Sequence, residues 1–221
     1  MFGTRYPPYR YKITVFIDTG HGVRSGSSVF EFHDAVAGDA ALADRGALFS
    51  QITGEAIKVQ LQDGRYVYCL LPSVSRNNWL RLILTVPKED IPDNRQHAYS
   101  DADMTNAVEK VLRSSRGVRD ITPAPKDPAY WPLTVTFEDE KNPESVRILN
   151  FDDEPRRLVG FGKLVRITAE LTDDPITTTL PLRFSRWWSA RENRSLAGGP
   201  QGRLTAGATD AQNLSRSDFF W

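Results

Sequence analysis

Residues 54–72 read GEAIKVQLQDGRYVYCLLP, and this stretch has the pattern of a β-hairpin. Asp63 and Gly64 separate two runs of alternating residues, and both tolerate the positive φ that a two-residue type I′ turn requires. With such a turn, one face of the hairpin is apolar or aromatic throughout: Ile57, Val59, Leu61, Tyr66, Tyr68 and Leu70. The pattern therefore predicts a hairpin in which Leu61 faces Tyr66. Its second strand is apolar on both faces, so we expect it inside a sheet and the first strand nearer an edge.

Alternating residues also predict strands before and after this hairpin. Residues 9–18 place four apolar side chains on one face: Tyr11, Ile13, Val15 and Ile17. A Gly-rich reversal at 19–22 leads to a second strand at 23–33, in which Gly26 indicates a bulge or a close approach of another segment. We expect residues 34–50 to form a loop or a single helical turn. Further strands are predicted at 79–86, 133–137, 146–151 and 164–171, the last with Val165, Ile167, Ala169 and Leu171 on one side.

Residues 100–116 carry the clearest helical pattern. Five apolar residues follow one stripe of a helix: Met104, Ala107, Val108, Val111 and Leu112. Ser100 or Asp101 suits the N-cap, and Gly117 suits the position just past the end. The expected fold class is therefore mainly β or α+β, with antiparallel, sandwich-like sheets and one amphipathic helix. We predict a single domain over residues 1–188.

The composition excludes several classes of protein. Lys plus Arg and Asp plus Glu both number 28, so the net charge gives no general argument for nucleic acid or an anionic membrane as a partner. The single cysteine, Cys69, excludes an intrachain disulfide and a multi-cysteine zinc site. No apolar run approaches the roughly 20 residues of a membrane span. The first residues lack the apolar core of a secretory signal, so a soluble cytoplasmic protein is the default expectation and an exported mature form the alternative.

Asp18-Thr19-Gly20 follows an apolar strand, as does the catalytic loop of the aspartic proteases. That chemistry needs two carboxylates sharing a proton, and the sequence holds no second Asp-Thr-Gly or Asp-Ser-Gly. A reversal between two strands is the alternative that we favour. A hydrolase of another type would have to use Asp18, His21 and Ser25, which lie close together in the sequence.

The remaining reactive residues give no recognisable site. His21, His33 beside Asp34, and His97 match no metal-binding spacing, and no nucleophile elbow, phosphate-binding loop or dinucleotide fingerprint is present. Cys69 lies in a predicted interior strand, where an inert core thiol is expected. We therefore predict no catalytic residue, no metal and no cofactor.

Basic and aromatic residues interleave near the end of the chain. The segment contains Arg183, Arg186, Trp187, Trp188, Arg191 and Arg194. Such a pattern fits stacking on single-stranded nucleic acid, an anchor for a protein partner, or two tryptophans that cap the core of a sheet. Residues 189–221 are polar and lack apolar periodicity, so we expect a tail that is disordered or ordered by a partner. The predicted partner-binding residues are Trp187, Trp188, Arg186, Arg191, Phe219, Phe220 and Trp221.

Two further stretches resemble a protein family. Residues 13–32, ITVFIDTGHGVRSGSSVFEF, and residues 164–180, LVRITAELTDDPITTTL, are similar to the opening and closing strands of an uncharacterised proteobacterial family. The resemblance implies a bacterial protein and a fold, with no established activity. Many members of that family carry an N-terminal export or lipoprotein segment, which is not evident here. They tend to stop soon after the Pro-Val-Thr region, whereas this chain continues for about forty residues.

These observations favour a non-enzymatic β-rich interaction or structural module. Its partner would be another protein or a second copy of the chain, bound through the C-terminal tail. A hydrolase that uses the turn at Asp18 and His21 is one alternative, and single-stranded nucleic-acid binding by the Arg/Trp segment is another.

Overall fold

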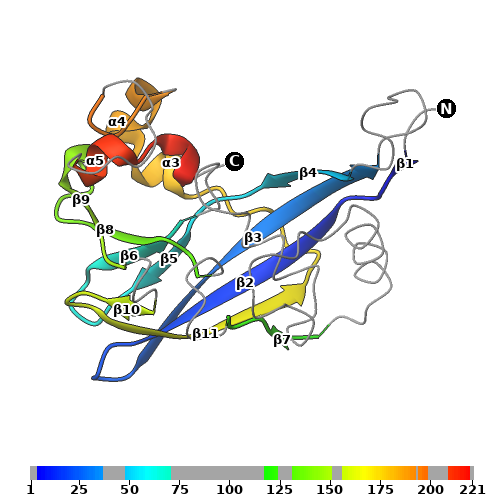
Figure 1. The fold of residues 1–221 in the computed structure, drawn as a ribbon, viewed down its shortest axis with the longest axis horizontal. Helices are drawn as coiled ribbons and strands as arrows, with labels where there is room; N and C mark the ends of the chain where they lie inside the picture. The colour runs from blue at the N-terminus through cyan, green and yellow to red at the C-terminus, as the bar shows by residue number, and fades with distance from the viewer. Residues whose placement is uncertain are drawn as a thin grey trace, which may run out of the picture.

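The computed structural model describes residues 4–36, 48–70, 117–123, 131–150, 156–192, 194–198 and 209–219. Within these ranges the chain is strand-rich, with antiparallel sheets and short helices, as the sequence predicts (Figure 1). The predicted helix at 100–116 and the predicted strand at 79–86 lie outside the described residues, as do His97, Phe220 and Trp221.

Seven described strands form the larger sheet, and neighbouring strands are antiparallel. They run in the order β1, β3, β2, β11, β10, with β4 also paired to β3 and β7 to β11. Their bounds are β1 Thr4–Arg5, β2 Tyr9–Asp18, β3 Val23–Val36, β4 Leu48–Thr53, β7 Arg119–Asp120, β10 Arg157–Leu158 and β11 Gly162–Leu171. The predicted strand at 9–18 is confirmed, and its four apolar residues are at most 1% exposed. The expectation of a loop over 34–50 is wrong at both ends, because β3 continues to Val36 and β4 begins at Leu48.

The strand β11 contains an irregularity that the alternation of its residues did not reveal. Leu164 pairs with Ile17, but the next residue paired with β2 is Arg166, so Val165 is an extra residue that forms a β-bulge. The bulge turns Leu164, which is fully buried, to the same side as Ile167. The prediction that Val165 shares the buried side is therefore wrong.

The smaller sheet has four described strands in the order β5, β6, β8, β9. They are β5 Ile57–Gln60, β6 Tyr66–Cys69, β8 Thr134–Phe137 and β9 Val146–Ile148. The hairpin of β5 and β6 is the one predicted from residues 54–72, and β6 lies inside the sheet with β5 at its edge, as expected.

The register of this hairpin differs from the prediction by one residue. Val59 pairs with Val67 instead of Tyr68, because the loop has three residues and not two. The N–H of Leu61 donates to the carbonyl of Arg65 over 2.9 Å, and the N–H of Gly64 donates back to Leu61. Gly64 has φ of 83°, the left-handed residue that closes a three-residue loop of this type.

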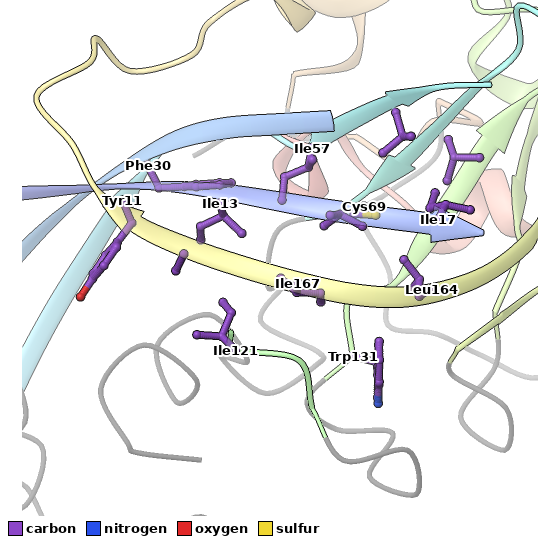
Figure 2. Packing of buried hydrophobic residues seen from close by; sticks show 14 of the residues in the cluster. Tyr11, Ile13, Ile17, Phe30, Ile57, Cys69, Ile121, Trp131, Leu164 and Ile167 are labelled. Atoms are coloured by element: carbon purple, nitrogen blue, oxygen red, sulfur yellow. The ribbon is translucent and has the colours of Figure 1, made fainter. Parts of the chain in front are cut away.

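This register divides the hairpin between two hydrophobic cores. The first core lies between the two sheets and takes Ile57, Val59, Val67 and Cys69 from the hairpin (Figure 2). The second core lies on the opposite face of the smaller sheet and contains Tyr68, Leu70, Val135 and Phe137. The two tyrosines of β6 thus face away from the larger sheet, whereas the predicted register placed them with Ile57 and Val59.

The second core is closed by the C-terminal part of the chain. Its helices are α3 Leu180–Arg183, α4 Ser185–Trp188, η4 Ser189–Arg191, α5 Asp210–Asn213 and η5 Arg216–Asp218. They gather at one end of the molecule near β8 and β9, and we call residues 180–198 and 209–219 the C-terminal cap (Figure 1). Another short helix, η3 Pro143–Ser145, precedes β9.

The expectation of a tail that is disordered or ordered only by a partner does not describe these residues. Leu196, Leu214 and Phe219 are each at most 2% exposed and belong to the second core. They are far apart in the sequence and follow no helical or strand period, because each comes from a separate short turn. That spacing is why composition alone predicted a solvated tail.

Candidate partner-binding site

The C-terminal cap is fixed to the rest of the chain by an acidic residue before β5. Glu55 is 2% exposed, and its carboxylate accepts hydrogen bonds of 2.7 Å from both the hydroxyl of Thr179 and the N–H of Leu180. These donors stand at the start of α3, where backbone N–H groups lack partners within the helix. Glu55 therefore sets the position at which the first helix of the cap begins.

Aromatic rings then pack the cap against the smaller sheet. The ring of Phe184 is stacked against both tryptophans, with its centroid 4.8 Å from that of Trp187 and 5.8 Å from that of Trp188. Its ring also lies 5.3 Å from Phe137 of β8 and 5.5 Å from Tyr68 of β6. The second core is thus a continuous cluster of rings, of the kind that favours edge-to-face and offset contacts.

A polar network closes the edge of this cluster. The hydroxyl of Tyr68 donates to Glu140 over 2.5 Å, and the guanidinium of Arg183 contacts the other oxygen of Glu140 at 2.6 Å. Arg183 also lies over the ring of Tyr66, 3.9 Å from its centroid. Burial raises the pKa of Tyr68, and the hydrogen bond to Glu140 raises that pKa further, so the tyrosine stays protonated and acts as a donor. The network therefore ties α3 to the hairpin.

The structure buries three of the predicted partner-binding residues. Trp187, Trp188 and Phe219 are 4%, 7% and 0% exposed, which agrees with the alternative in which the two tryptophans cap a sheet core. The indole N–H of Trp187 donates to the carbonyl of Glu140 over 2.8 Å. Neither tryptophan offers a ring face to solvent, which is what stacking on a nucleic-acid base requires.

The outer side of α3 and α4 carries the exposed members of the segment. Backbone N–H groups of Phe184 and Trp188 bond to residues four positions earlier, so the helical path continues through both helices. Leu182 and Arg186, also four residues apart, therefore share one face. Leu182 is 80% exposed, and Arg186 is exposed beside it. Arg191, half-buried, lies 3.8 Å from Glu144.

The turn that held the hydrolase candidates is an exposed reversal between β2 and β3. The carboxylate of Asp18 accepts the N–H of Gly20 over 2.9 Å, which stabilises the turn. The backbone carbonyl of His21 accepts from Gln62, and Ser25 pairs across the sheet with Phe16. All three candidate side chains are exposed, so this part of the chain presents them to solvent individually.

His33 contacts a different acid from the one beside it in the sequence. Its ring nitrogen Nε2 lies 2.8 Å from Glu31, which also accepts from Arg10 over 2.7 Å. Adjacent strand residues face opposite ways, so Asp34 instead accepts from Tyr9. Hydrogen bonds from Arg10 and then His33 lower the pKa of Glu31. Among the described residues, no cluster of His, Cys, Asp or Glu could hold a metal ion.

Cys69 is a core thiol, and we expect it to resist labelling. Burial raises its pKa to about 12 from a usual 9.0, despite a weak bond from Thr134. At neutral pH the folded chain then carries about a thousandfold less thiolate than an exposed cysteine does. In a Ser217→Cys variant, a thiol reagent should react quickly with the exposed cysteine at position 217. The same reagent should react with Cys69 only after urea has unfolded the chain. Rapid labelling of Cys69 in the folded wild-type chain would contradict this burial.

The raised pKa of Cys69 also makes the stability of the folded chain depend on pH. Above pH 9 the unfolded chain releases the thiol proton, whereas the folded chain keeps it up to about pH 12. The folded state thus binds more protons in this range, so the contribution of this thiol to stability is fully present below pH 9 and is lost as the pH rises towards 12. Tyr68 acts in the same direction at still higher pH.

No family model, curated protein or solved structure matches the chain, a result consistent with a family whose activity is not established. None of the described helices is long and apolar enough to cross a membrane. Over the described residues, the fold is strand-rich and contains two antiparallel sheets.

Sequence reasoning missed the residues that hold the C-terminal cap in place. Glu55 belongs to no local motif, Glu140 lies in a run of charged residues, and Asp210 lies within the polar tail. Their roles depend on partners between 43 and 125 residues away, Asp210 bonding to the N–H of Ile148 and Glu55 to that of Leu180. Leu182 was likewise missed, since an isolated leucine gives no signal of exposure in the sequence.

Proposed function

We propose that this protein is a non-enzymatic interaction or structural module whose C-terminal cap presents a protein-binding surface. The observation that carries the proposal is the use of three acidic residues, of which Glu55 is buried and Glu140 and Asp210 are half-buried. Glu55 accepts the N–H of Leu180 at the start of α3. Glu140 joins Tyr68 to Arg183, and Asp210 accepts the N–H of Ile148 in β9. Each carboxylate joins one element to another, as expected in a scaffold that holds a surface rigid.

The proposed surface is the outer face of α3 and α4, centred on Leu182 and Arg186. On the opposite side of these helices, Phe184 and both tryptophans pack into the second core. A partner would therefore meet a surface that is already ordered. Such preorganisation lowers the entropy cost of binding. Arginine is enriched in protein interfaces, and an 80% exposed leucine gives the patch an apolar centre.

Capture experiments with single substitutions test this surface. We expect Leu182→Asp and Arg186→Glu each to reduce the recovery of a native partner by about tenfold or more, the effect of losing 1.4 kcal/mol at a binding hot spot. Val118→Asp is the matched control, because Val118 is 61% exposed next to β7, away from the C-terminal cap in Figure 1. A partner retained equally by all three variants would exclude this surface.

Truncation before α4 is a less informative test. It would remove the rings of Trp187 and Phe219, which fill the second core. A loss of binding could then reflect unfolding, whereas the two surface substitutions leave that core intact.

A further inference from the structure

One edge of β3 is covered by the chain along only part of its length. On the side away from β2, β4 pairs with β3 from Glu31 to Val36. Next to this pairing, the N–H of Val29 donates to the hydroxyl of Thr177 over 2.8 Å, and the carbonyl of Val29 accepts the N–H of Thr177 over 3.3 Å. Val29 therefore points its backbone groups away from β2, and the chain itself supplies their partner.

The same edge continues without a partner toward the turn between β2 and β3. The ladder between these strands has no register shift, and residues two apart in a strand point their backbone groups to the same side. The N–H and C=O groups of Val23, Ser25 and Ser27 therefore also point away from β2. Among the described residues these groups have no hydrogen-bond partner, and all three residues are exposed. We call residues 23–27 the open edge.

The surroundings of the open edge leave it accessible. It lies at the free tip of the β2–β3 hairpin, apart from the C-terminal cap (Figure 1). β5 crosses β3 at Gly26, where a Cβ atom would lie 1.9 Å from the carbonyl oxygen of Lys58. Gly26 pairs with the buried Val15, so this crossing is on the core face of β3. The crossing strand thus leaves Ser25 and Ser27 exposed to solvent.

The open edge lacks most of the features that keep other strands away from a sheet edge. Unpaired N–H and C=O groups form a template for another strand, and proteins block them with prolines, β-bulges or charged side chains. Residues 23–27 read VRSGS, without proline, and they pair with β2 without a bulge. Their single charged residue, Arg24, is exposed and forms no ion pair within the described part of the chain. A lone arginine repels a basic segment and attracts an acidic one.

We propose that the open edge binds an extended, acidic peptide of a partner protein, which joins the larger sheet as an antiparallel strand beside β3. Hydrogen bonds to the backbone of Val23, Ser25 and Ser27 supply the affinity, as in other cases of strand addition. Arg24 selects a peptide that carries a carboxylate. The antiparallel direction is the one that every described pair of strands in this sheet adopts. This second interaction surface is independent of the one proposed on the C-terminal cap.

Amide hydrogen exchange in the free, full-length chain tests whether the edge is open. The N–H groups of Ser25 and Ser27 point to solvent. Those of Gly26 and Ser28 point the other way, toward β2. We expect the first two amides to exchange at least about a hundredfold faster than the other two when followed by NMR. Equal protection of all four amides would show that another part of the chain covers the edge, and would overturn the inference.

A proline substitution then tests recognition of the backbone. Ser25→Pro removes an outward N–H without removing a hydrogen bond to β2, whereas Ser25→Ala keeps the N–H and removes only the hydroxyl. Random octapeptides displayed on phage are selected on the immobilised full-length chain, and the bound peptides are synthesised. We expect acidic peptides that bind the wild-type and Ser25→Ala chains equally. Their affinity for Ser25→Pro should be at least about tenfold lower, because one backbone hydrogen bond is lost and the ring obstructs the edge.

The other outcomes of the selection decide against the inference. A selection without binders, or with binders that tolerate Ser25→Pro, overturns it. Peptides lost in Leu182→Asp but retained by Ser25→Pro would support the C-terminal cap as the binding surface instead, so the two proposals fail separately. A wild-type dimer that Ser25→Pro dissociates would identify a second copy as the occupant and overturn the peptide partner. The exchange measurement uses the wild-type chain, so it decides the matter even where Ser25→Pro does not fold.

Discussion

Replacing Phe219 by alanine should lower the free energy of unfolding by about 3–5 kcal/mol, the usual cost of removing a buried phenylalanine. The ring is fully buried among Tyr68, Phe137 and Phe184, and the rigid sheet on one side prevents the site from collapsing. Part of the loss should appear as local opening, because Phe219 is the last described anchor of the C-terminal cap. Urea unfolding followed by tryptophan fluorescence measures both effects, since Trp187 and Trp188 share this core.

The matched control for this substitution is Leu182→Ala. Leu182 lies in the same cap but is 80% exposed, so its truncation should change stability by less than about 0.5 kcal/mol. Equal unfolding midpoints for the Phe219 and Leu182 variants would show that the end of the chain is not packed in solution.

Replacing Gly26 by alanine should separate the two sheets and cost about 3 kcal/mol or more, the upper end of the cost of overpacking a core. A Cβ atom at this position would lie 1.9 Å from the carbonyl oxygen of Lys58 and 2.7 Å from its carbon. Both are backbone atoms of β5, so no side-chain rotation can relieve the clash. The sequence indicated a bulge or a close approach at Gly26, and the close approach is confirmed.

Gly117→Ala is the control, because a Cβ at Gly117 meets nothing within 4 Å and its φ is not positive. Urea denaturation followed by circular dichroism should give a clearly lower unfolding midpoint for Gly26→Ala than for Gly117→Ala. If Gly26→Ala unfolded at the same urea concentration as Gly117→Ala, β3 could not cross β5 as closely as the structure places it.

The sequence predicted β2 correctly because its alternation is strong, whereas it missed the start of β4, which lies in a stretch expected to be a loop. The face of β2 with Tyr11 and Ile17 was found correctly, since the other face carries Lys12 and Asp18. The hairpin register failed for the opposite reason: β6 is apolar on both faces, so the pattern could not decide which face meets Ile57. An Asp-Gly pair also fits loops of two and of three residues.

The candidate site was harder to predict, because it depends on contacts between distant segments. Trp187 and Trp188 have the composition of an exposed binding motif, yet their rings fill a core whose other half comes from β6 and β8. Glu55 gives no local signal, since its partner at α3 is 125 residues further along the chain. Local periodicity predicts which face of an element is apolar, but not which element covers it.

The covering of the smaller sheet by residues 209–219 has a consequence for biosynthesis. On the ribosome, Tyr68 and Phe137 are made long before Phe219, so their rings stay uncovered until residues 209–219 have been made. Transiently exposed apolar surfaces of this kind promote aggregation of nascent chains. A premature stop codon or proteolytic nick near residue 208 would make that exposure permanent, so cells that shorten this protein should accumulate it in inclusion bodies or bound to chaperones.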